Sequence, residues 1–341
     1  MFLNERARQQ LTFNALLTIS GLFLSVPQAY GQALPQPTGT ATRQASAQKS
    51  FTPVIWRDPG TTDLLGGPAG EVGAPSPPFT FIEENLKGSN PKIKVKDANG
   101  LEWSVKWGTE VNAETFATRL VAAVGYFAEP AYFVPSGKIE GVTGLTRAKS
   151  KVKEDGSFVD ARFELKGEKG VKKLEDEESW SWADNPFVGK RELNGLKIMV
   201  MLVSNWDNKD VRDVKRGSNT AIFQTKGEAR YVVTDWGGSM GKWGGFISRE
   251  KWDCGGFTSQ TKNFIKGVKN GMVEFGYSGQ HSKDFWSDIR VQDVQWLIQY
   301  LDRITDDQLK AGLASAGASP EDQVCFTKAL RERIIQLRNV K

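Results

Sequence analysis

The sequence is poor in the residues that carry several common chemistries. Among its 341 residues it has one histidine, His281, and two cysteines, Cys254 and Cys325. A single histidine argues against a His-based zinc site and against a Ser-His-Asp triad. Two cysteines allow one disulfide, but a sequence cannot place them within bonding distance, so a bridge and two free thiols both stay open.

Long apolar runs are equally scarce. The main one, Leu11–Val26, follows two arginines and precedes small residues at 29, 31 and 33. This order is typical of an export signal, so we expect residues 1–33 to be a signal peptide cleaved after Gly31 or Ala33. The alternative is a membrane anchor, for which sixteen apolar residues are short. We therefore expect an exported protein, periplasmic or extracellular, that is not an integral membrane protein after cleavage.

The excess of positive charge is small. Lysine and arginine number 45 against 40 acidic residues, and basic runs such as 149–153 alternate with acidic runs such as 175–178. Mixed patches of this kind are typical of solvated surfaces, so no nucleic-acid partner is expected. The 11 tryptophans leave open a ligand surface rich in aromatic rings.

Composition and periodicity divide the chain into segments. Residues 34–52 are rich in Gln, Ala, Ser, Thr and Pro and predict a disordered linker. The stretch 51–78 has the Pro and Gly content of a loop, with Trp56, Leu64 and Leu65 expected to pin it to the folded part. We expect a strand-rich N-terminal lobe with one helix over 53–190 and a helix-rich C-terminal lobe over 191–341.

In the first half, alternating apolar residues predict strands and one 3.6-residue pattern predicts a helix. The helix covers 113–124 and ends at Gly125, and the Asn99–Gly100 turn predicts a hairpin. The expected strands are 79–82, 92–96, 101–107 and 131–134, followed by a hairpin made of short pieces at 144–146 and 158–165.

In the second half the helical period dominates. A buried helix is expected over 192–204, and an amphipathic one over 294–304. Thr305 with Gln308 makes a capping box for the next helix, and Ser319 begins the last one. Strands followed by helices predict an α+β fold.

Polar side chains gather where apolar segments end. The apolar run 198–203 leads into a loop with Asn205, Asp207 and Lys209, Asn219 begins the next apolar segment, and Asp235 follows the apolar run 231–233. Carboxylates with an amide between them suit a site that holds a divalent cation against phosphate oxygens.

Taken in order, these residues resemble the protein-kinase-like superfamily in its atypical bacterial and secretory branches. The order is Lys106 on a strand, Glu114 on the following helix, then Asp207, Asn219 and Asp235-Trp236-Gly237. The stretch 106–125 is similar to HipA-like kinases, and 103–126 with 194–241 resembles an uncharacterised group of exported bacterial proteins. The resemblance covers about residues 79–310 and implies a two-lobed kinase-like fold, with an antiparallel sheet in one lobe and mainly helices in the other.

The resemblance also implies residue roles. Lys106 would bind the nucleotide's α- and β-phosphates, steadied by Glu114 or, as the other candidate acid, Glu110. Asp207 would orient the attacking hydroxyl and accept its proton, while Lys209 would neutralise the transferred phosphoryl group. Asp235 would bind magnesium or manganese.

The sequence departs from the family pattern at two places. Arg212 stands where the second metal-binding residue belongs, so we read 211–218 as an insertion and assign the role to Asn219, with Asp213 as the fallback. No Gly-x-Gly-x-x-Gly loop is present, and only the turn containing Gly88 and Ser89 is placed to cover a nucleotide.

The resulting hypothesis is an exported kinase-like protein that transfers phosphate from Mg-ATP to an unknown protein, glycan or lipid acceptor. A catalytically inactive, pseudokinase-like binding module is the nearest alternative. A second alternative is a carbohydrate- or partner-binding protein that uses exposed tryptophans, namely Trp180, Trp182, Trp206, Trp236, Trp243 and Trp252. Packing of these rings in the core is the ordinary expectation.

Overall fold

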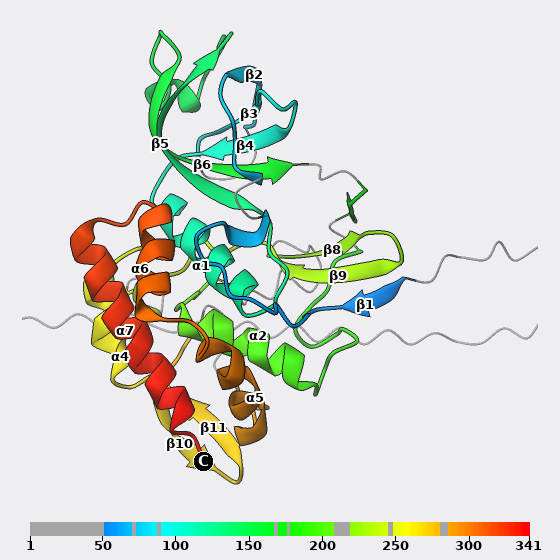
Figure 1. The fold of residues 1–341 in the computed structure, drawn as a ribbon, viewed down its shortest axis with the longest axis vertical. Helices are drawn as coiled ribbons and strands as arrows, with labels where there is room; N and C mark the ends of the chain where they lie inside the picture. Colours follow the sequence, from blue (N-terminus) through cyan, green and yellow to red (C-terminus); the bar gives the residue numbers. More distant parts are fainter. Residues whose placement is uncertain are drawn as a thin grey trace, which may run out of the picture. The chain divides into compact units, whose positions relative to one another are not determined.

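The structure is a computed structural model that describes residues 51–69, 73–86, 90–166, 170–175, 178–207, 219–244, 248–279 and 286–341. Strands form most of the first part and helices most of the rest (Figure 1), so the α+β prediction is confirmed. No helix in these ranges combines the length and apolar character needed to cross a membrane.

Several predictions fall outside the described residues. These are the signal peptide, nearly all of the linker, and five single residues, namely Gly88, Ser89, Lys209, Asp213 and His281. The segment boundaries at 33, 52 and 190 stay predictions.

Five strands form a closed barrel in the order β2-β3-β4-β6-β5. Their bounds are β2 Phe79–Glu84, β3 Lys92–Lys96, β4 Glu102–Lys106, β5 Ala131–Glu140 and β6 Ser157–Lys166. β2, β3 and β4 are antiparallel neighbours in succession, as predicted, and β2 closes the barrel by pairing in parallel with β5. Alternate residues such as Val95, Trp103 and Val105 are fully buried inside, because side chains in a strand alternate between the two faces.

The hairpin that completes the barrel differs from the prediction. Residues 144–146 form no strand; instead β5 runs on to Glu140 and pairs with β6. Gly137 allows this pairing, since a Cβ there would lie 2.7 Å from the ring of Phe158 on β6. Thr146 lies in a loop, where its backbone N–H and its hydroxyl donate to Glu84, each at 2.7 Å.

A buried helix, α1 Val111–Ala123, follows β4 and confirms the predicted one. The helix ends before Gly125, whose φ of +99° favours glycine. Gly125 also lies against the segment 52–58, because a Cβ there would come within 2.1 Å of the Arg57 carbonyl oxygen.

A second sheet has the order β1-β9-β8-β7, with β1 Thr52–Val54, β7 Lys172–Lys173, β8 Thr220–Gln224 and β9 Glu228–Val233. β1 lies in the stretch predicted to be loop, and its three residues pair in parallel with β9. A three-residue strand is too short to show a period of two, which is why alternation did not reveal it. Leu64 is buried and the indole N–H of Trp56 donates to the Val124 carbonyl at 2.7 Å, so both hold this stretch as predicted. The prediction was wrong for Leu65, whose side chain is exposed.

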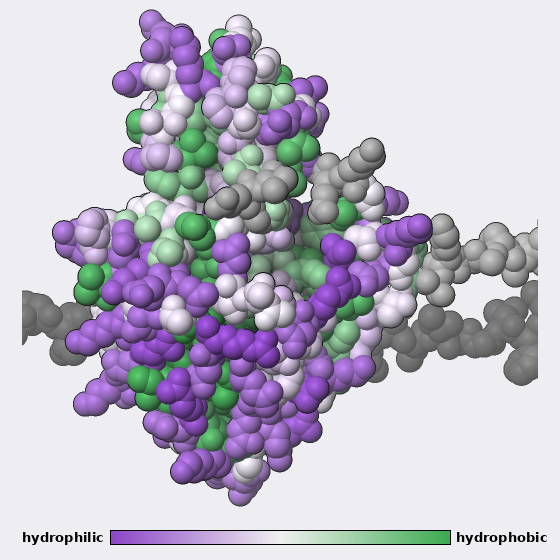
Figure 2. All heavy atoms as spheres, in the orientation of Figure 1, coloured by the Kyte–Doolittle hydropathy of each residue, from purple (hydrophilic) through white to green (hydrophobic). Residues whose placement is uncertain are grey.

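Most of the remaining elements surround the larger hydrophobic core, whereas the short helix at 148–150 packs Ala148 into the core of the barrel. They are η1 Gly67–Ala69, η3 Ala148–Ser150, α2 Arg191–Leu202, α4 Cys254–Thr261, β10 Ile265–Lys269, β11 Met272–Phe275, α5 Val291–Leu301, α6 Asp306–Ser315 and α7 Pro320–Arg338. The predicted buried helix, the Thr305–Gln308 capping box and the Ser319 cap are all present. The β10–β11 hairpin was not predicted. Figure 2 shows mostly hydrophilic side chains, with apolar ones scattered among them, over α5, α6 and α7 on the face drawn.

Cys254 at the start of α4 and Cys325 in α7 form a disulfide, which answers the question that the sequence left open. The bridge joins two helices across 71 residues of chain.

Candidate functional site

Lys106 is the last residue of β4 and points out of the barrel, because Trp103 and Val105 point into it. Its Nζ lies 2.8 Å from Glu110 Oε2 and 3.7 Å from Glu114 Oε2. Burial acts to lower the pKa of Lys106, but the carboxylates of Glu114 and Glu110 outweigh it and raise the pKa. The structure thus brings the predicted lysine to both candidate acids.

A tight turn makes this contact possible over only eight residues. Gly108 has a φ of +126°, a conformation that glycine adopts most readily, and it turns the chain from β4 into α1. Glu110 then occupies the N-cap position, with its side chain turned to other partners, and Glu114 lies in the first turn of the helix. Both carboxylates therefore face the end of β4.

Glu114 is held from the other side by Arg162, a residue that sequence reasoning missed. Arg162 stands directly opposite Lys106 on β6, forms an ion pair with Glu114 and binds Glu164 at 2.6 Å. Both Arg162 and Glu114 are buried. The only signal in the sequence was charged residues alternating with apolar ones along 160–165, and a solvent-exposed strand face has the same pattern.

Glu110 joins three parts of the chain. Besides Lys106, it accepts a hydrogen bond from Asn90 Nδ2 at 2.7 Å and forms an ion pair with Lys251. Burial acts to raise its pKa, but Lys106 and Lys251 dominate and lower the pKa to about 2. Glu110 also packs on Gly237, where a Cβ would lie 2.9 Å from its carboxyl carbon.

Asp235 follows β9 and lies in the electric field of the same cluster. Its Oδ1 accepts from the Gly237 N–H at 3.0 Å, and its carbonyl oxygen accepts from Asn205 Nδ2 at 2.9 Å. Burial and the Glu114 carboxylate raise the pKa of Asp235 to about 6, against the opposing effect of Lys106. Residues from β4, α1 and the end of β9 therefore meet at one place.

Asp207 lies near these residues because its loop packs against the backbone of the Asp-x-Gly segment. Trp206 N–H donates to the Gly238 carbonyl at 3.2 Å, and a Cβ at Gly238 would lie 2.9 Å from Asp207 Cβ. Asn219, which is buried, donates from Nδ2 to the Asp207 carbonyl oxygen. Asp207, Asn219 and Asp235 thus lie on neighbouring segments.

Arg333 of α7 fixes the start of this loop and was not predicted. Its guanidinium is fully buried and donates to the Leu202 carbonyl and to Ser204 Oγ, both at 2.8 Å. Tyr277 donates its hydroxyl proton to the Asn205 carbonyl oxygen. These two side chains hold the backbone on which Asp207 is carried. Nothing near Arg333 in sequence marks it, because a charged residue in an amphipathic helix is ordinarily exposed.

The six tryptophans do not form an exposed surface. Trp180, Trp182, Trp206, Trp236 and Trp243 are each at most 5% exposed, and Trp252 is half-buried. The indole N–H of Trp206 donates to the Glu250 carbonyl at 2.8 Å, and the guanidinium of Arg249 lies 4.1 Å from its ring centre. The expectation that the rings pack in the core is confirmed. These six tryptophans therefore do not offer the exposed surface that the carbohydrate-binding alternative requires.

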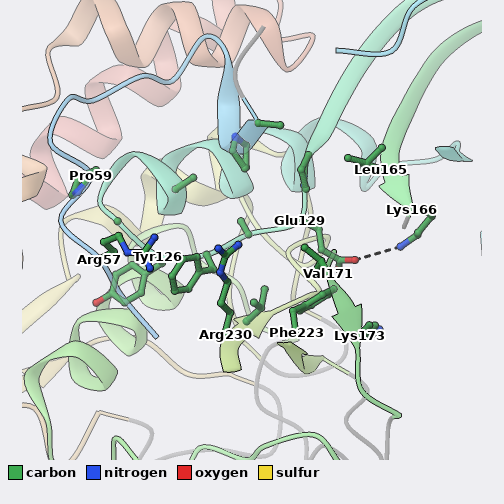
Figure 3. A pocket seen from close by; sticks show the side chains of 18 of the residues that line it. Arg57, Pro59, Tyr126, Glu129, Leu165, Lys166, Val171, Lys173, Phe223 and Arg230 are labelled. Carbon is green, nitrogen blue, oxygen red and sulfur yellow. Dashed lines mark hydrogen bonds and ion pairs between the residues drawn. The ribbon is translucent and has the colours of Figure 1, made fainter. Parts of the chain in front are cut away.

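A cavity of about 640 Å³ lies between the barrel and the β8–β9 strands, and its walls contain none of the residues named so far in this subsection. Figure 3 shows Phe223, Arg230, Lys166 and Glu129 on these walls, and Figure 2 shows apolar side chains in the same hollow. Arg57 and Arg230 bind Glu228, which does not line the cavity, and Lys166 binds Glu129. Most of the cations on its walls thus already have a carboxylate partner.

Within the described ranges, no three His, Cys, Asp or Glu side chains form a ready-made metal site. The candidate donors for a cation are therefore fewer. They are Asp235, the buried Asn219 and Glu114, whose Oε2 is buried without a hydrogen bond.

Comparison with known proteins gives a distant likeness. No protein-family model matches the sequence, and no curated protein matches it. A crystal structure of the Golgi casein kinase is similar over 78% of this chain and 74% of its own, with 10% identity and a TM-score of 0.36. A second one, with Mn/ADP bound, is similar over 77% and 73%, with 9% identity and a TM-score of 0.37. At these values the function of that kinase does not transfer to this chain.

Proposed function

We propose that the chain is an exported, two-lobed kinase-like enzyme that transfers a phosphoryl group from ATP, with magnesium or manganese, to an acceptor hydroxyl. The observation that carries the proposal is the contact of Lys106 with Glu110 and Glu114. These three charges also act electrostatically on the Asp235 carboxyl group. A lysine held by a helix carboxylate beside a carboxylate at a strand end suits phosphate binding, which requires positioning and charge neutralisation.

The residues present fit a divalent cation. The Glu114 carboxylate lies close enough to Asp235 to oppose the ionisation of Asp235, and Glu114 Oε2 lacks a hydrogen bond. A bound cation would relieve both, with Asp235 and Asn219 as protein ligands and Glu114 beside them. The cation would neutralise charge on the phosphate oxygens and align them.

Asp207 is the candidate base for the transfer. In the reaction the acceptor oxygen forms a bond to the γ-phosphorus, the bond from that phosphorus to the bridging oxygen of ADP breaks, and Asp207 takes the hydroxyl proton. Arg333, Tyr277 and Gly238 hold the Asp207 backbone in place. The roles proposed for Lys209, Asp213, Gly88 and Ser89 concern residues outside the described ranges.

Two features bear on the alternatives and on export. Lys106 lies nearer to Glu110 than to Glu114, so its charge is already satisfied, which favours the inactive, pseudokinase-like binding module as second candidate.

The Cys254–Cys325 disulfide supports export, because such bridges persist in oxidising compartments.

The test is a thermal-shift titration of the mature protein with ATP, with and without magnesium or manganese, followed by a phosphate-transfer assay. We expect a shift that requires both nucleotide and metal and that Asp235→Ala abolishes, while Asp207→Ala keeps the shift and loses transfer. Asp307→Asn, an exposed change on α6, serves as control. A wild-type protein with no shift would overturn the nucleotide site, and a shift without transfer would leave the binding module.

A further inference from the structure

Three cations stand side by side across three strands of the barrel. Lys92, the first residue of β3, is directly opposite Lys106 on β4, and Lys106 is directly opposite Arg162 on β6. Directly opposed residues in antiparallel strands have their Cβ atoms about 5 Å apart, and like charges at that distance destabilise a sheet. The barrel therefore bears an electrostatic cost along this row.

Two members of the row are compensated and the third is not. Lys106 binds Glu110 and Glu114, and Arg162 binds Glu114 and Glu164. Lys92 forms no ion pair within the described ranges. Burial lowers the pKa of Lys92, and Lys106, Lys166, Arg147 and Arg162 lower it further. The environment of Lys92 is thus cationic on several sides.

Lys94, two residues along the same strand, shows the ordinary arrangement. It projects from the same face as Lys92, since residues two apart in a strand share a face. Its Nζ lies 3.0 Å from Glu83 on β2, and this hydrogen bond outweighs a slight burial effect and raises the pKa of Lys94. Lys94 is therefore matched with an acid from the neighbouring strand, whereas no carboxylate of the described ranges pairs with Lys92.

The backbone around Lys92 joins it to the site. Its carbonyl accepts from the Asn85 N–H at 3.0 Å, and Asn90, two residues before it, donates to Glu110 at 2.7 Å. The Pro91 carbonyl accepts from the Trp107 N–H at 3.3 Å. Lys92 is thus held at the end of the barrel where Lys106 meets α1.

We propose that Lys92 is a second phosphate-binding cation, which together with Lys106 makes the site select nucleotides by their number of phosphates. The inference rests on the proposed function. It adds that the site recognises the di- or triphosphate chain of the nucleotide. A polyphosphate brings several negative charges to the place where Lys92 has no carboxylate partner among the described residues. The ammonium group of lysine suits this role, because it acts as a compact point charge on a flexible stem.

The test compares Lys92→Gln with the matched control Lys94→Gln by calorimetric titration of ATP, ADP and adenosine in the presence of manganese. A charge-assisted hydrogen bond lost from Lys92 lowers ATP affinity roughly tenfold or more. We expect this loss for ATP, with adenosine binding unchanged and Lys94→Gln within about twofold of wild type. Lys92→Arg, which keeps the charge, should recover most of the affinity.

The outcomes separate the inference from the proposed function. If the wild-type protein binds no ATP, the proposed function fails and the inference fails with it. If it binds ATP and Lys92→Gln weakens binding no more than Lys94→Gln, the inference alone is wrong. A further readout needs no ligand, because removing the uncompensated charge should raise the melting temperature of the ligand-free protein for Lys92→Gln only. A lower melting temperature for that variant would contradict the electrostatic repulsion between Lys92 and the neighbouring cations, on which the inference rests.

Discussion

Lys106 and Arg162 hold the same carboxylate, that of Glu114, from directly opposite positions on β4 and β6. Arg162 and Glu114 are both buried, and Arg162 also binds Glu164. Buried ion pairs thus attach α1, the helix that carries Glu114, to the barrel. If one partner is removed, water cannot reach the charge that is left. Removing one partner of such a buried cluster costs more than the intact cluster contributes, because the remaining charge is left unpaired.

We therefore predict that Arg162→Met destabilises the protein by about 3–5 kcal/mol, since it leaves Glu114 and Glu164 buried with less compensation. Urea unfolding followed by tryptophan fluorescence measures the change. The control is Arg57→Met, whose exposed ion pair with Glu228 should be worth less than about 1 kcal/mol. Equal effects for the two variants would show that the Arg162 cluster is solvated in solution.

The pH dependence of stability should carry the signature of Asp235. Burial and Glu114 raise its pKa to about 6 in the folded protein, against an ordinary 3.8. Between about pH 4 and pH 6 the unfolded chain loses this proton before the folded one, so the free energy of unfolding falls as the pH rises. The full loss is about 3 kcal/mol, from about two pKa units at 1.36 kcal/mol each.

Asp235→Asn cannot titrate, so it should lack this decline and be more stable than wild type at pH 7, while losing the metal-dependent response to ATP. Urea unfolding of both proteins from pH 4 to pH 7 measures the difference. A constant difference over that range would mean that Asp235 ionises normally. Addition of manganese and ATP to the wild type should reverse the decline, because a bound cation favours the carboxylate.

The site residues whose position depends on a single strand or helix were predictable from the sequence. Lys106 ends an alternating strand and Glu114 begins a periodic helix, so their order was visible without coordinates. Arg162 and Lys92 were not predictable, because their importance depends on which strands lie side by side. Closure of the barrel and the pairing of β5 with β6 are set by contacts between distant residues, which local periodicity does not encode.

The Cys254–Cys325 bridge should be a large contributor to stability. It closes a loop of 71 residues between α4 and α7, and the loss of chain entropy in the unfolded state corresponds to about 4 kcal/mol. Arg333 on α7 also donates to the Phe257 carbonyl of α4 at 2.9 Å, so loosening this helix pair should reach the loop that carries Asp207. We predict that Cys325→Ser, or reduction with dithiothreitol, lowers both the melting temperature and any phosphate transfer. Dithiothreitol should leave Cys325→Ser unchanged, and a wild type that melts at the same temperature with and without it would contradict the bridge.

Gly238 offers the sharpest test of how Asp207 is placed. A Cβ at this position would lie 2.9 Å from Asp207 Cβ, closer than such atoms approach, and in a tight contact of 3.0 Å with Asn205 Oδ1. The Gly238 carbonyl also accepts from the Trp206 N–H at 3.2 Å, so the backbone cannot move away without losing that bond. Gly238→Ala should therefore shift Asp207, lower phosphate transfer at least tenfold and destabilise the protein by about 1–3 kcal/mol.

The control is Gly267→Ala on β10, where a Cβ would meet no atom within 4 Å. This change should leave transfer unaltered and stability unchanged or slightly higher, because alanine restricts the unfolded chain. Transfer rates and urea unfolding of the two variants form the measurement. If Gly238→Ala matched Gly267→Ala in both, the close packing of Asp207 on the Asp-x-Gly segment would have no part in the reaction. If stability alone fell, the site would tolerate the displacement and another group would have to accept the proton.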